Sequence, residues 1–145
     1  MTTITEPTVG RFSVEIDLVN ALDLANADAG TKNPSDVRRT KLRALVDTGA
    51  TRLVIPEKVA DQLGLKASGQ IKVRYADGHT AERKIVDFIR LNYAGRTAVF
   101  DAIVEPSRET ALIGAVVLEL LDLVVDCTNQ RLVPRDPKEI ISEVE

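Results

Sequence analysis

Alternating apolar and polar residues along the chain predict a series of strands. From Phe12 to Leu18 every second residue is apolar, which is typical of a half-buried strand and places one over residues 10–20. The same pattern and the turn residues between apolar runs predict further strands at residues 37–46, 53–55, 71–75, 80–91 and 97–104. This even spacing favours a mainly β fold in the form of a small closed β-barrel.

One or two short helices are expected among these strands. Pro56 can begin a helix that runs through Leu63, and Gly64 can end it. A second apolar run over residues 116–121 follows a glycine and also predicts a helix.

The remaining segments carry weaker signals. Residues 20–36 are expected to form a surface loop, although residues 21–25 could form a helical turn. A hairpin over residues 123–133 is expected near the end of the chain. Residues 135–145 form a tail, for which a short helix that begins near Asp136 and simple fraying are both open.

Length and composition restrict the architecture and the function. With 145 residues, 44% of them hydrophobic, the chain has material for one ordinary core, so one domain is expected over residues 1–145, with its core at about 37–134. The net charge is −3, without a concentrated basic stripe, which disfavours nucleic-acid binding. The basic residues at 38–43 lead into an apolar strand, and we interpret them as a solvated strand face.

The location of the protein is inferred from what its sequence lacks. No apolar run reaches the ~20 residues that a bilayer-spanning helix needs. Residues 1–7 lack the charged and apolar blocks of a signal peptide. These features predict a soluble, cytoplasmic protein that does not bind membranes.

An acid on a glycine-containing turn is the principal chemical candidate. Asp47, Thr48, Gly49 and Ala50 follow directly after the apolar run 44–46. A strand would hold Asp47 rigidly, and Gly49 has no Cβ, so the backbone can bend there and approach neighbouring groups closely. Two such turns face to face would hold two carboxylates that share one proton, because ionising both at near contact is electrostatically expensive.

Two further elements extend the motif. Leu112, Ile113 and Gly114 form a second apolar-apolar-glycine segment before the expected second helix. Between the two motifs, Asp77 and Gly78 form the Asp-Gly pair of a predicted hairpin turn. Such a hairpin could act as a mobile flap over a binding cleft.

In this order of elements, the chain resembles the retropepsin-like aspartic proteases, especially their bacterial single-domain members. The resemblance covers about residues 37–134 and implies a closed barrel of the retropepsin type. It implies that Asp47 is the catalytic aspartate and that residues 48–50 support its loop. It also implies that Gly78 lies at the flap tip and that residues 112–114 pack behind the active-site loop.

The chain departs from the viral members of that family at two places. Ala115 stands where viral enzymes usually have a polar residue that consolidates the dimer. The N-terminal segment is also longer, and residues 135–145 do not form an obvious apolar strand. The terminal sheet of the viral dimer is therefore not expected here.

The single Asp-Thr-Gly has a consequence for assembly. A complete pair of aspartates requires a second copy of the chain across a two-fold axis, so catalysis predicts a homodimer that cleaves a peptide or protein substrate. No cofactor is expected. Two alternatives remain open, namely a non-proteolytic dimeric module that binds peptides, and a domain in which Asp47 only stabilises its turn.

Other types of active site find little support. His79 is the sole histidine, and it lies in the predicted hairpin beside no evident nucleophile, so it is interpreted as a solvated side chain. Cys127 is the only cysteine and is expected to pack in the core. The other acids show no spacing with histidine or cysteine that is typical of a metal site, so no metal is expected. Those acids are Asp61, Asp87, Asp101 and Asp126.

Overall fold

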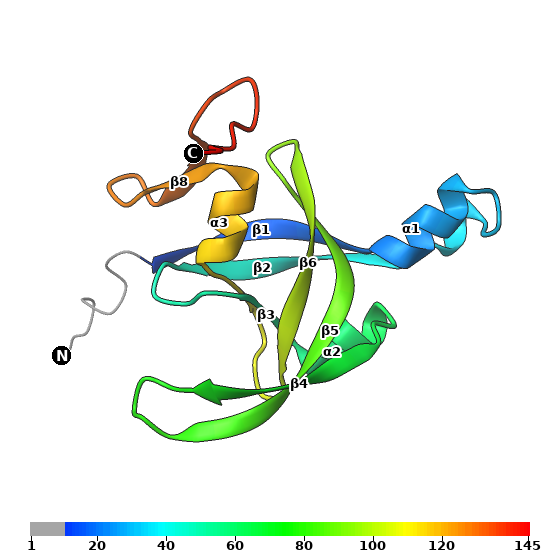
Figure 1. Cartoon of the computed structure of the whole chain (residues 1–145), viewed down its shortest axis with the longest axis horizontal. Coiled ribbons are helices and arrows are strands. Elements are labelled where there is room, and N and C mark those ends of the chain that lie inside the picture. The colour runs from blue at the N-terminus through cyan, green and yellow to red at the C-terminus, as the bar shows by residue number, and fades with distance from the viewer. Residues whose placement is uncertain (1–10) are drawn as a thin grey trace.

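The computed structural model describes residues 11–145 and shows a closed β-barrel (Figure 1). One sheet of seven strands has the order β1-β2-β7-β3-β6-β5-β4, and an additional pairing of β1 with β5 closes it. The strand bounds are β1 (Arg11–Asn20), β2 (Arg39–Asp47), β3 (Leu53–Pro56), β4 (Ala67–Arg74), β5 (Thr80–Tyr93), β6 (Arg96–Glu105) and β7 (Ala111–Ile113). The mainly β barrel expected from the sequence is thus confirmed, with β4 extending beyond the closed part.

The alternation of the first strand explains how the barrel closes and fills. β1 pairs antiparallel with β2 along its length, and its last residues, Asp17–Asn20, also pair antiparallel with β5. The apolar side chains on its inner face, such as Ile16 and Leu18, are buried, as are Val46 on β2 and Leu91 on β5. Burial of each such side chain stabilises the fold by roughly 1.5–3 kcal/mol.

Three short helices cover the barrel, whereas the sequence predicts only one or two. They are α1 (Ala21–Asp28), α2 (Glu57–Gln62) and α3 (Ala115–Leu121), and a 3₁₀ turn, η2, spans Pro34–Asp36. The last two α-helices match the predicted ones. Residues 20–36 are therefore not all loop: the helical turn left open at residues 21–25 is present and extends to Asp28, because Asn20 caps it by accepting a hydrogen bond from the Asp23 amide at 2.9 Å.

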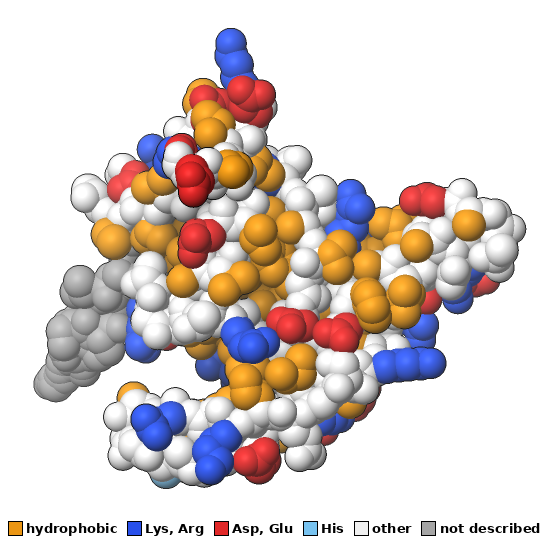
Figure 2. Space-filling view, viewed as in Figure 1, with side chains coloured by type: hydrophobic (Ala, Val, Ile, Leu, Met, Phe, Trp, Pro, Cys, Tyr) orange, Lys and Arg blue, Asp and Glu red, His pale blue; other side chains and the backbone are white. Residues whose placement is uncertain are grey.

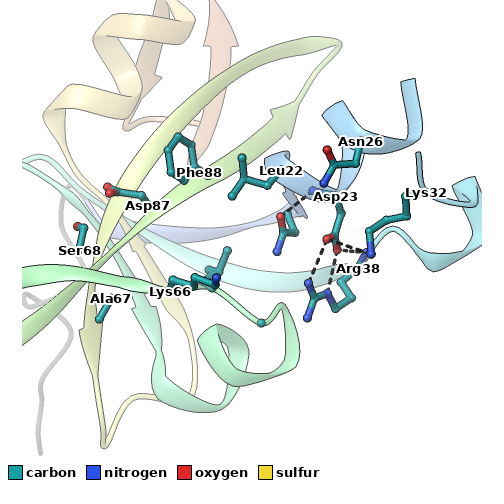
Figure 3. A pocket seen from close by; sticks show the side chains of 13 residues that line it. Leu22, Asp23, Asn26, Lys32, Arg38, Lys66, Ala67, Ser68, Asp87 and Phe88 are labelled. Carbon is teal, nitrogen blue, oxygen red and sulfur yellow. Dashed lines mark hydrogen bonds and ion pairs between the residues drawn. The ribbon is translucent and has the colours of Figure 1, made fainter. Parts of the chain in front are cut away.

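An ion pair between the buried Asp23 and the half-exposed Arg38 fastens α1 to the barrel. Asp23 is 4% exposed and accepts hydrogen bonds from the Arg38 backbone amide at 3.0 Å and from Arg38 Nε at 2.8 Å. Figure 3 shows these contacts at one side of a cavity of about 380 Å³. Arg38 also packs against Gly64, where an added Cβ would collide with the Arg38 guanidinium. The Arg38 bonds hold the pKa of Asp23 far below its usual value, although burial alone would raise it.

The basic run 38–43 is mostly a solvated face, as expected. Arg39, Lys41 and Arg43 are exposed on β2, and Arg39 pairs with Asp17 at 3.0 Å. Arg38 is the exception, because it meets the buried Asp23 carboxylate.

The C-terminal part differs from expectation in two ways. The predicted hairpin is present as β8 (Leu123–Asp126) and β9 (Arg131–Pro134), but Cys127 lies exposed in its turn, so the expected core position is wrong. The tail after Pro134 contains no helix. It is held instead by side-chain contacts, since Arg96 donates to the Glu139 carbonyl at 3.1 Å and Asp122 accepts from the Ile141 amide at 3.1 Å.

Residues 1–10 lie outside the range that the structure describes. The segment 1–7, which lacks the features of a signal peptide, and Gly10 at the start of the first predicted strand both lie there. Among residues 11–145, no helix combines the length and the apolar character needed to cross a bilayer.

The Asp23–Arg38 pair predicts a specific pH dependence of stability. Because the folded-state pKa of Asp23 is lowered, the pair stabilises the fold fully above the reference value of 3.8, and the effect is lost as the pH falls through the lower folded-state pKa. We expect Asp23→Asn to reduce the free energy of unfolding by about 2 kcal/mol at neutral pH and by progressively less in strong acid.

Urea unfolding as a function of pH measures this difference. Asp61→Asn, which removes an exposed acid on α2, is the matched control and should change stability by less than about 0.5 kcal/mol. A deficit of Asp23→Asn that stays constant down to strongly acidic pH would contradict the prediction.

Candidate active site

The end of β2 presents Asp47 at the edge of the barrel. Its carboxylate is 15% exposed, and both of its oxygens have partners. Oδ1 accepts a hydrogen bond from the Gly49 amide at 2.9 Å, and Oδ2 lies 3.4 Å from Nη2 of Arg11, which faces Asp47 in the β1–β2 register. The Ala50 amide donates to the Asp47 carbonyl at 3.1 Å, so the turn and the side chain are fixed together.

Gly49 lies tightly against the acid itself. A Cβ at this position would lie 3.2 Å from Asp47 Oδ1, closer than an ordinary van der Waals contact. Any larger residue would therefore crowd the carboxylate that the Gly49 amide binds. Thr48 is exposed, and its hydroxyl makes no hydrogen bond to another residue in 11–145.

The second glycine motif lies directly behind this turn. Leu112 on β7 pairs with Leu45 on β2 and with Val54 on β3, so β7 joins the strands on either side of the Asp47 turn. At Gly114, an added Cβ would lie 2.6 Å from the Thr51 carbonyl carbon and 2.8 Å from the Ala50 carbonyl oxygen. The backbone of residues 50–52 thus occupies the space that a side chain would need.

Two hydrogen bonds connect α3 to the same turn. The Ala115 amide donates to the Ala50 carbonyl at 2.9 Å, and the Val116 amide donates to the Thr51 carbonyl at 2.9 Å. Ala115 therefore contributes through its backbone. The Asp47 turn is braced by its own amides in front and by Gly114 with the start of α3 behind.

A groove of about 860 Å³ runs between the Asp47 turn and the hairpin formed by β4 and β5. Figure 2 shows it as the notch between that hairpin and the body of the molecule. Asp47, Gly49 and Ala50 line it, together with apolar side chains from four strands. These apolar residues are Val54, Ile71, Val73, Ile103 and Leu112.

A hydrogen-bonded cluster attaches the hairpin to β6. The Tyr75 hydroxyl lies 2.5 Å from Glu105 Oε2, and Arg83 Nε donates to Glu105 Oε1 at 2.9 Å. Burial and the bond to Glu105 raise the pKa of Tyr75, so the phenol stays protonated and donates a hydrogen bond to the carboxylate. The position of the hairpin over the groove therefore depends on Glu105, a side chain of the barrel wall.

The hairpin tip has the predicted Asp-Gly turn. Gly78 has a φ of +92°, and its amide donates to the Tyr75 carbonyl at 2.9 Å. Asp77 accepts from the His79 amide at 3.0 Å, which with the nearby His79 ring lowers the pKa of Asp77. The His79 imidazole is exposed, as expected, and stacks on the Tyr75 ring with centroids 4.5 Å apart.

The structure brings together some of the predicted site residues and separates others. Asp47, Gly49, Ala50 and Leu112 line one groove, whereas Ile113 and Gly114 lie behind it as supports. Asp77 and Gly78 lie at the hairpin tip and are not among the residues that line the groove within this chain.

Several residues of the groove were not found by sequence reasoning. Tyr75 follows Ile71 and Val73 at spacings of two, so strand periodicity could have placed it on the same face. Arg11, Glu105 and Arg108 belong to no motif, and only the fold brings them to the groove. Among residues 11–145, no three His, Cys, Asp or Glu side chains gather in a metal-binding arrangement.

Comparison with known proteins agrees with this geometry. A family model described as gag-polyprotein putative aspartyl protease matches residues 35–119, which is more than half of the chain. The matched segment includes the Asp47 turn, the β4–β5 hairpin and the Gly114 support. No curated protein matches the chain closely enough to identify a relative.

The close contact at Gly114 predicts the effect of a single methyl group. Gly114→Ala places a Cβ against backbone atoms that cannot rotate away, so we expect a loss of about 2 kcal/mol in the free energy of unfolding. Gly69→Ala is the control, because its Cβ would meet nothing within 4 Å. Chemical denaturation measures both variants, and equal stabilities would contradict the packing described for Gly114.

Proposed function

The chain belongs to this aspartyl protease family, and from that premise we propose that it is an aspartic endopeptidase that acts as a homodimer. The observation that supports this most is the position of Asp47, whose carboxylate lies on the wall of an open groove and is fixed by the Gly49 amide. Asp47 is the proposed catalytic residue. Thr48, Gly49 and Ala50 form its loop, and residues 112–114 support that loop.

The second carboxylate must come from another copy of the chain. The sequence contains one Asp-Thr-Gly, and a two-fold axis close to the Asp47 turn would place two such turns face to face. Thr48 and Gly49 are exposed at this turn, so a partner can approach it without displacing core residues. In the dimer, the two grooves would join into one cleft with an Asp47 pair at its centre.

The reaction then follows from sharing one proton between the two carboxylates. The ionised Asp47 takes a proton from a water molecule as its oxygen attacks the peptide carbonyl carbon. The protonated Asp47 donates a hydrogen bond and then its proton to the carbonyl oxygen. The resulting gem-diol intermediate breaks at its carbon–nitrogen bond: the leaving nitrogen receives the proton that the first Asp47 took from water, and one hydroxyl of the intermediate returns its proton to the second, now ionised Asp47. No covalent acyl-enzyme and no cofactor are required.

The β4–β5 hairpin is the proposed flap. An extended peptide in the groove can pair its backbone with the hairpin, as in binding by strand addition, while apolar side chains enter the subsites lined by Ile71, Val73 and Leu112. Gly78 and Asp77 at the tip would reach toward the partner's tip and limit access of water to the cleft.

Removal of the carboxylate tests catalysis. We expect Asp47→Asn to lower kcat/KM on an unbiased peptide library by at least about 10³-fold at mildly acidic and neutral pH, because the amide can neither accept nor donate the required proton. Asp61→Asn should leave cleavage unchanged. Equal cleavage by the wild type and Asp47→Asn would contradict the mechanism, and peptide binding without any cleavage by the wild type would favour a binding module.

Mixing of subunits tests the shared site. When inactive Asp47→Asn chains are added in excess to wild-type chains, heterodimers form that contain only one aspartate, so the activity per wild-type chain should fall toward zero. The measurement is the cleavage rate at fixed wild-type concentration, with Gly69→Ala as a competent partner for control. Activity that is unaffected by the added mutant, or a strict monomer by solution mass, would contradict a site built from two chains.

A further inference from the structure

The groove has a charge opposite to that of the whole chain. The full sequence carries a formal net charge of −3. The residues that line the groove, in contrast, include five cations and only two acids, Asp47 and Glu105. The cations are Arg11, Arg52, Lys72, Arg74 and Arg108. A substrate that follows this groove therefore meets a locally positive surface.

Both lining carboxylates are already neutralised. Asp47 faces Arg11 at 3.4 Å, and Glu105 accepts hydrogen bonds from Arg83 Nε at 2.9 Å and from Tyr75. Arg83 itself does not line the groove. Neither carboxylate is therefore available to neutralise the remaining cations.

Among residues 11–145, three of the five lining cations have no ion pair. Arg11 pairs with Asp47 and Arg52 pairs with Asp101 at 3.2 Å, whereas Lys72, Arg74 and Arg108 contact no carboxylate within 4.0 Å. Within the described range, Arg108 thus offers an unpaired charge at the groove, whereas Lys72 and Arg74 alternate along β4 with the groove-facing Ile71 and Val73, so their side chains leave the other face of that strand.

Arg108 is the most strongly positioned of these cations. Its Nε donates to the Thr110 carbonyl at 2.9 Å, and its Nη2 donates to the Thr110 hydroxyl at 3.1 Å. Both acceptors are uncharged, so no carboxylate neutralises the positive charge of the guanidinium. Because the side chain is already held, binding a carboxylate there costs less rotational freedom than with a free arginine.

Lys72 and Arg74 lie on β4, the edge strand beside which an extended peptide would add as a further strand. β4 is the last strand of the sheet and pairs only with β5, so its other edge is open (Figure 1). Along β4, the apolar residues Ile71 and Val73 alternate with the two cations. Lys72 faces Glu82 in the β5 register, but Arg74 faces Thr80, which carries no charge. A peptide strand added at this edge gains from acidic side chains near Arg74.

We propose that this groove, together with the open edge of β4, selects peptides with acidic side chains flanking an apolar scissile pair, with Arg108 at the groove and Arg74 on the outer face of β4 as the specificity-determining residues. The proposal rests on the proposed endopeptidase function. In a two-fold symmetric dimer each cation occurs once on either side of the catalytic pair, so acidic residues are favoured on both sides of the scissile bond. The lining offers Ile, Val and Leu rather than a row of aromatic rings, which favours peptide side chains over the bases of nucleic acids.

Matched peptide pairs test this specificity. Each pair shares an apolar centre and differs only in Glu or Gln at the flanking positions. We expect the wild type to prefer the Glu peptide by about tenfold in kcat/KM at low salt, the effect of a few exposed ion pairs acting together. The preference should shrink at high ionic strength.

Charge-removing variants locate the effect. Arg108→Gln and Arg74→Gln should each reduce the Glu/Gln ratio several-fold, and the double variant should bring it close to one. Lys41→Gln removes the same charge from an exposed position on β2 outside the groove and should leave the ratio unchanged. A ratio that falls equally in Lys41→Gln would overturn the assignment to the groove.

Binding to Asp47→Asn separates this inference from the proposed function. Fluorescence anisotropy with labelled Glu and Gln peptides measures the preference without any cleavage, so it remains valid even if the wild type cleaves nothing. Equal or weaker binding of the Glu peptide overturns the proposed specificity, whereas failure of the proposed endopeptidase is seen only in the cleavage assay. Tight binding of single-stranded DNA that depends on Arg108, without a Glu preference, would also overturn it.

Discussion

The position of the candidate acid depends on one close contact between two backbones. Gly114 lies so near residues 50–52 that an added Cβ would be 2.6 Å from the Thr51 carbonyl carbon. The Ala115 and Val116 amides bind the Ala50 and Thr51 carbonyls across the same contact. This contact lets β7 lie beside β2 and places the Asp47 carboxylate at the surface while its turn stays rigid. Any side chain at Gly114 would push the turn out of register with the groove.

The charged side chains of the barrel have two roles, one in stabilising the fold and one at the groove. Outside the groove, the buried Asp23 pairs with the half-exposed Arg38 and holds α1 to the barrel, so these charges serve stability. At the groove, Glu105 attaches the hairpin through Tyr75 and Arg83. These pairs consume the nearby carboxylates and leave Arg74 and Arg108 for a ligand. Within the described residues, the unpaired positive charge at the groove therefore results from the structural contacts that already occupy the nearby carboxylates.

Local sequence patterns predict the structural features that depend on residues adjacent in the chain. The alternation in β1, the Asp-Gly hairpin and the two glycines at positions 49 and 114 can be predicted from the sequence. Each reflects either strand periodicity or a place where the backbone comes close to neighbouring groups. The sequence indicates a loop at residues 20–36 with at most a helical turn at 21–25, since the stability of the full helix comes from the Asn20 cap and from Asp23 reaching Arg38. Cys127 was misplaced because composition favours burial while the β8–β9 turn exposes it. The cations of the groove come from separate elements, and no single segment reveals them.

The central claim is that two Asp47 carboxylates meet on a two-fold axis. An experimental structure of the full-length protein in its dimeric form, determined with a non-cleavable extended peptide, measures the distance between them directly. We expect carboxylate oxygens within hydrogen-bonding reach, about 3 Å apart, with the peptide between them and the two hairpins. A dimer whose Asp47 side chains lie on opposite faces, with no shared cleft, would contradict it.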